Sequence, residues 1–126
     1  MGLLLFLTGC HLAGEREYYS HVENYIADEA VVDSIKFSED PEYIKLKLSG
    51  IDDRYQDNDF IIKGKSVAIV IEKGIFEQIH VGDRIQYTSA PAYFGNSYCM
   101  PIVELSVEGI VILSFEDGYR NLLELY

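Results

Sequence analysis

Basic side chains are scarce in this chain. Its 126 residues include 10 lysines and arginines against 21 aspartates and glutamates, which gives a net charge of −11. Nucleic-acid binding depends on basic side chains that neutralise phosphates and release counterions. Anionic lipid surfaces attract polybasic segments through the same electrostatics. The composition therefore argues against nucleic acid as a partner, and it leaves covalent or hydrophobic attachment as the route to a membrane.

Cysteines and known catalytic motifs are also few or missing. Cys10 and Cys99 are the two cysteines, and neither has a second cysteine or a histidine at zinc-site spacing. The chain contains no G-x-S-x-G, H-E-x-x-H, G-x-G-x-x-G or P-loop pattern. It also lacks a run of roughly 20 apolar residues that could form a transmembrane helix. No cofactor and no catalytic residue is predicted, although acids and bases assembled from distant residues stay open.

A short apolar run opens the chain. It extends from Leu3 to Leu7 without a charge and is followed by Thr8, Gly9 and Cys10. The order Leu7-Thr8-Gly9-Cys10 resembles the lipobox of bacterial lipoproteins. In that family the cysteine thiol receives a diacylglyceryl group, and the peptide bond before the cysteine is then cut. A nucleophilic thiolate and small preceding residues suit that chemistry.

The lipoprotein resemblance implies a division of the chain into three parts. Residues 1–9 are the remnant of a signal peptide, residues 10–17 are a tether lipidated at Cys10, and residues 18–126 form a single globular domain. Signal peptides carry a basic region before the apolar core, whereas the first basic residue here is Arg16, so a start upstream of Met1 is also expected. The alternative is a short buried strand that happens to end in Leu-Thr-Gly-Cys.

Periodicity predicts the elements of the body. Apolar side chains recur on one face of residues 15–27, which predicts a helix. Alternating or β-branched segments predict strands at 30–37, 43–49, 60–62, within 81–89, at 101–107 and at 110–115, the last largely buried. The alternation slips near Asp33-Ser34, which predicts a bulge. Residues 66–74 fit a strand or a helix, and the Gly74 C-cap signal favours a short helix.

The end of the chain predicts a second helix. Ser114 and Asp117 have the spacing of a capping box, and apolar residues repeat at helical intervals from Tyr119 to Tyr126. The fold class is therefore α+β and mainly antiparallel β, with an N-terminal and a C-terminal helix. Five to six short strands, with a helix before the fourth, resemble the element order of an oligonucleotide/oligosaccharide-binding (OB) barrel. That order alone says nothing about a ligand.

An acidic loop at 50–59 is the candidate metal site. Its carboxylates belong to Asp52, Asp53, Asp57 and Asp59, and calcium prefers several such oxygen ligands. The loop lacks the spacing of an EF-hand and its distant glutamate. Solvated turn residues are the alternative interpretation.

The loop at 90–100 is the candidate partner site. Tyr93, Phe94 and Tyr98 lie among turn-forming residues, and aromatic side chains on a loop can contact a protein or a glycan. Equally, Tyr93 and Phe94 can fold back and cap the barrel. Cys99 has no base beside it in the sequence, so we expect a buried or half-buried apolar role for it.

Together these features predict a lipid-anchored binding or interaction module on the extracytoplasmic face of the cell membrane, of the Gram-positive type. Its partner would be an envelope protein or a glycan. One alternative is a small envelope enzyme that uses carboxylates such as Glu104 or Asp83, which a pair of carboxylates across a cleft would favour. Another is a soluble cytoplasmic protein with a chance lipobox match, which a paired N-terminal strand would favour.

Overall fold

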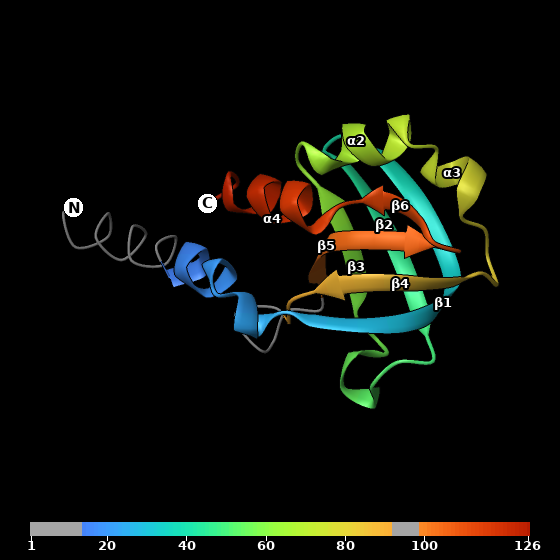
Figure 1. Cartoon of the computed structure of the whole chain (residues 1–126), viewed down its shortest axis with the longest axis horizontal. Coiled ribbons are helices and arrows are strands. Elements are labelled where there is room, and N and C mark those ends of the chain that lie inside the picture. Colours follow the sequence, from blue (N-terminus) through green and yellow to red (C-terminus); the bar gives the residue numbers. More distant parts are fainter. Residues whose placement is uncertain (1–13, 92–98) are drawn as a thin grey trace.

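The computed structural model describes residues 14–91 and 99–126. These residues form one mainly antiparallel sheet of six strands that curves into a barrel (Figure 1). The strands, in chain order, are β1 (Ile26–Glu39), β2 (Glu42–Ser49), β3 (Asp59–Lys63), β4 (Arg84–Ser89), β5 (Cys99–Val107) and β6 (Ile110–Leu113). The predicted α+β class with a small barrel is confirmed.

The barrel closes through β3 and β5. The sheet order is β3-β2-β1-β4-β5-β6, and β3 also pairs in parallel with β5, where Phe60 lies opposite Met100. Five strands therefore form a closed ring, and β6 lies outside it, next to β5. β1 pairs with both β2 and β4. Closure removes most free sheet edges.

Short helices connect β3 to β4 at one end of the barrel. Residues 66–74, which fitted either state, form helix α2 (Ser66–Glu72), and α3 (Ile75–Gln78) follows it. Gly74 between them has φ = +83°, a left-handed conformation that favours glycine. The favoured helix is thus confirmed. Val67 and Val70 are buried against the barrel, and the opposite face of the helix is exposed, so its amphipathic pattern matches its position.

The predicted bulge is present in β1. Pairing of β1 with β2 shifts in register between Val32 and Ser34. A bulge bends a strand and increases its twist, which suits a strand of 14 residues that pairs with β2 along one part and with β4 along another. The inward side chains of all strands form one apolar core, in which Phe60 and Tyr87 meet edge to face at 5.3 Å.

The two ends of the described chain pack together on one side of the barrel (Figure 1). A helix at residues 14–20 is followed by a 3-10 turn, η1 (Val22–Asn24), and the chain ends in α4 (Phe115–Leu123). Tyr19 stacks on Tyr126 with ring centroids 5.4 Å apart, and the Tyr119 hydroxyl donates to the Ser20 carbonyl at 2.6 Å. The N-terminal helix is thereby fixed to the domain.

The N-cap of α4 is confirmed. The Ser114 hydroxyl accepts a hydrogen bond from the backbone N–H of Asp117 at 3.2 Å. On the apolar side of this helix, Leu122 is buried, while Tyr119 and Leu123 are partly buried.

Several boundaries and one burial pattern differ from the sequence predictions, and the largest differences are these. The helix expected over 15–27 ends at residue 20, because Ile26 already pairs with Ser89 in the sheet. It begins at residue 14, so residues 14–17 of the expected tether belong to the helix. The last strand is not largely buried: Ile110 and Val111 are 45% and 54% exposed, since β6 lies outside the closed ring.

Candidate functional site

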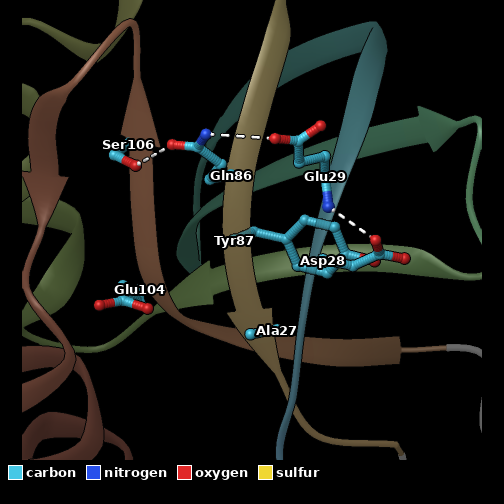
Figure 2. A pocket seen from close by; sticks show the side chains of 7 residues that line it. All are labelled: Ala27, Asp28, Glu29, Gln86, Tyr87, Glu104 and Ser106. Atoms are coloured by element: carbon cyan, nitrogen blue, oxygen red, sulfur yellow. Dashed lines mark hydrogen bonds between the residues drawn. The ribbon is translucent and has the colours of Figure 1, made fainter.

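A depression of about 360 Å³ lies over β1, β4 and β5 and opens to solvent (Figure 2). It is lined by side chains and backbone of three adjacent strands: Ala27, Asp28, Glu29, Gln86, Tyr87, Glu104 and Ser106. Three of these residues carry carboxylates, which are the groups that acid–base chemistry would use.

Hydrogen bonds across the strands occupy several polar groups of this depression, although the Tyr87 hydroxyl has no partner among the described residues. Glu29 and Ser106 lie on either side of Gln86 in the sheet. The Gln86 amide donates to the Glu29 carboxylate at 3.3 Å, and the Ser106 hydroxyl donates to the Gln86 carbonyl at 3.2 Å (Figure 2). Such cross-strand pairs stabilise a sheet. The hydrogen-bonded row Glu29–Gln86–Ser106 is therefore explained by its contribution to the sheet, without a ligand.

The alternative of a small envelope enzyme relied on two carboxylates, Glu104 and Asp83. The structure does not bring them together. Glu104 lines the depression and accepts a hydrogen bond from the Thr88 hydroxyl at 2.6 Å. Asp83 lies in the turn before β4, where its carboxylate accepts from the His80 backbone N–H at 2.9 Å and caps that turn. It does not line the depression.

Asp52 in the acidic loop has a partner of its own. It caps the 3-10 turn η2 (Asp53–Tyr55) and accepts from the Arg54 side chain at 2.9 and 3.1 Å and from the Arg54 backbone N–H at 2.9 Å. Hydrogen bonds from the Arg54 side chain, and then from its backbone N–H, lower the pKa of Asp52 to about 2. The Asp52 carboxylate is therefore already hydrogen-bonded to the Arg54 guanidinium and to the backbone of the η2 turn.

The other carboxylates of the loop are spread along it. Asp59 is part of β3 and forms an ion pair with Lys47 at 2.8 Å, while Asp53 and Asp57 are exposed. Over residues 14–91 and 99–126, no three histidine, cysteine or acidic side chains are grouped so that they could hold a metal ion. None of the four aspartates of the candidate metal site therefore belongs to such a group within the described residues.

The predicted partner loop and lipidation site fall outside the described residues. This applies to Cys10 and to Tyr93, Phe94 and Tyr98. Cys99, the first residue of β5, is described, and the expectation of a buried or half-buried side chain is wrong because it is exposed. In an alternating strand the inward position goes to the next residue, and Met100 is fully buried there.

A group of four lysines on β1, β2 and β3 was not predicted as a site. Lys45, Lys47 and Lys63 are next to buried core residues in their strands and so lie on the outer face of the barrel, and Lys36 lies on the same face because it pairs with Lys45. Lys36 lies directly opposite Lys45, which in turn lies opposite Ile61. We call these four residues the lysine face. The outward alternation of Lys45 and Lys47 was visible in the sequence, but their proximity to the other two depends on strand pairing.

Comparison with known proteins gives no relative: no family model, no curated protein and no solved structure matches the chain. Within the part of the chain that the structure describes, none of the helices has the length and apolar character needed to cross a membrane.

Proposed function

We propose that this protein is a lipid-anchored binding module on the extracytoplasmic face of a bacterial cell membrane, with its anchor at Cys10. The sequence Leu7-Thr8-Gly9-Cys10 after an apolar run carries the proposal. In a lipoprotein, a cysteine in this position is both the modified residue and the first residue of the mature chain. Two acyl chains on it would give stable attachment, since each buried methylene contributes about 0.8 kcal/mol.

The arrangement of the domain supports this proposal. A folded barrel follows Cys10 closely, and its first helix, at residues 14–20, is packed against α4 by aromatic side chains and hydrogen bonds. The Arg16 guanidinium also donates to the Leu123 carbonyl at 2.6 Å. Gly14 follows Cys10 by four residues, so the barrel would stay close to the bilayer surface even at the maximal reach of about 3.5 Å per residue.

The test is the intact mass of the protein recovered from the membrane fraction of a bacterial host. We expect a chain that begins at Cys10 and carries the added mass of a diacylglyceryl group. Cys10→Ser should abolish both the added mass and the membrane association. Cys99→Ser is the matched control, because it replaces the other cysteine, which is exposed; it should leave the mass addition and the membrane association intact.

An unmodified chain that keeps residues 1–9 and stays in the soluble fraction would overturn the proposal. The same is true of membrane association that persists in Cys10→Ser, because attachment would then not depend on the thiol.

A further inference from the structure

The lysine face concentrates positive charge on an acidic protein. It contains four of the ten basic residues of a chain with net charge −11. Fields at a protein surface are screened over about 10 Å at 0.1 M salt, so a ligand on this face responds mainly to the charges near it. The net charge of the whole chain therefore does not decide what this face binds.

Two of the four lysines are available to a ligand. Lys47 is paired with Asp59 at 2.8 Å, and the Lys63 ammonium lies over the Tyr126 ring at 5.6 Å. Lys36 and Lys45, in contrast, form no ion pair with any residue of the described ranges. They lie directly opposite each other on neighbouring strands, where like charges destabilise a sheet. An anion placed between them would relieve that repulsion.

The residues around the lysines favour an extended ligand. The face is the surface of three paired strands (Figure 1). Lys36 is about 5 Å from Lys45 across the strands, and Lys47 is about 7 Å from Lys45 along β2. Lys63 lies opposite Tyr43. Tyr43 and Ile61 lie on the same surface and are half-buried, so they offer apolar contact between the charges. The face has lysines and no arginine. Lysine binds an anionic oxygen as a point charge, whereas arginine binds carboxylate and phosphate alike through a bidentate fork, so this face suits a flexible chain of separate negative charges.

We propose that the lysine face binds an anionic envelope polymer whose repeats are linked by phosphodiesters, such as a poly(glycerol phosphate) chain. The choice of an envelope polymer rests on the proposed extracytoplasmic location. The phosphates of successive repeats contact Lys36 and Lys45 first, and Lys47 and Lys63 follow where the polymer displaces their present partners.

The test uses the full chain carrying Cys10→Ser, purified in non-ionic detergent, and immobilised poly(glycerol phosphate) as the probe. Lys36→Gln/Lys45→Gln should weaken binding on the order of tenfold. Lys65→Gln/Lys73→Gln is the matched control, because these lysines flank α2, are not on the paired strands β1–β3, and removing them changes the net charge equally. This control should weaken binding by less than about twofold. The logarithm of the affinity should fall with the logarithm of salt with a slope of about −1.5 or steeper, and the double variant on the face should flatten it.

Several results would overturn the proposal. No binding, or equal loss in both double variants, would show that the face has no special role. Tighter binding of single-stranded DNA would assign the face to nucleic acid, and equal binding of poly-glutamate would assign it to acidic protein. None of these results depends on lipidation, so the mass measurement at Cys10 tests the location separately.

Discussion

Gly118 of α4 lies against the backbone of Val103 in β5. A Cβ atom on Gly118 would overlap the Val103 carbonyl oxygen and lie 2.7 Å from the Val103 Cα atom. The approach depends on a bulge in β5. Thr88 pairs with Glu104 and the next residue, Ser89, pairs with Ile102. Val103 therefore has no partner residue in β4, and its side chain packs with Leu122 and Tyr19 in the apolar cluster beneath α4.

Gly118→Ala should therefore destabilise the fold, although alanine is the better helix former. Helix propensity favours alanine by about 1 kcal/mol, but an overlap with backbone cannot be relieved by a side-chain rotation, and overpacking costs about 1–3 kcal/mol or more. We expect a net loss of about 2 kcal/mol in the free energy of urea unfolding. Glu116→Ala, at an exposed position of the same helix, should change it by less than about 0.5 kcal/mol. Equal stability of Gly118→Ala and the parent would contradict this packing.

The like-charge pair on the lysine face predicts a stability gain on substitution. Lys36→Gln removes the repulsion from Lys45 opposite, so thermal unfolding at low salt should indicate a gain on the order of 0.5 kcal/mol. The gain should shrink at about 0.5 M salt, because exposed charges are screened there. Lys73→Gln, away from this pair, serves as the control. A loss of stability in Lys36→Gln at low salt would show that its charge has a stabilising partner.

A tyrosine-to-phenylalanine change should have opposite effects at two positions. The Tyr87 hydroxyl is buried and has no hydrogen-bond partner among the described residues, so Tyr87→Phe should stabilise the fold by about 1 kcal/mol. The Tyr119 hydroxyl donates to the Ser20 carbonyl, so Tyr119→Phe should cost about 1 kcal/mol and speed amide exchange in residues 14–20. Denaturant unfolding of both variants measures whether each substitution raises or lowers the free energy of unfolding. A destabilising Tyr87→Phe would reveal a partner for that hydroxyl.

The Asp52–Arg54 contact makes a small part of the stability depend on pH. Because the folded pKa of Asp52, about 2, lies below the ordinary value of 3.8, the contact stabilises the fold above pH 3.8. That stability is lost as the pH falls toward 2. The stability difference between the parent and Asp52→Asn should therefore shrink over this range.

Carboxyl NMR titration measures the same contact directly. Arg54→Gln should return the Asp52 pKa toward 3.8, whereas Arg84→Gln, whose side chain approaches Glu29 instead, should leave it near 2. An Asp52 pKa that is the same in the parent and in Arg54→Gln would show that the guanidinium does not hold this carboxylate.

Local periodicity determined much of the fold in advance. The alternation of Ile44, Leu46 and Leu48 with lysines fixed both the second strand and its outward face, and the slip at Asp33-Ser34 located the bulge. The cap at Ser114 was likewise set by nearby residues. For residues 66–72 periodicity fitted a strand or a helix, and the Gly74 signal favoured the helix that is observed. Each of these features depends on which side of its own strand or helix a residue occupies, and neighbours along the chain decide that. The lipobox-like tetrapeptide is a feature of sequence in the same sense.

Long-range pairing decided the rest. Ile26 joined the sheet rather than the helix because Ser89 lies beside it, and Val103 turned toward α4 because the register of β5 shifts against β4. The lysine face has the same origin: Lys36 and Lys45 are nine positions apart in the chain and become opposite neighbours through the hairpin register, and Lys63 reaches the same surface through β3. The sequence by itself determined that Lys45 and Lys47 point outward, whereas the tertiary structure decided which lysines share a surface. That depends on contacts between segments that no local pattern encodes.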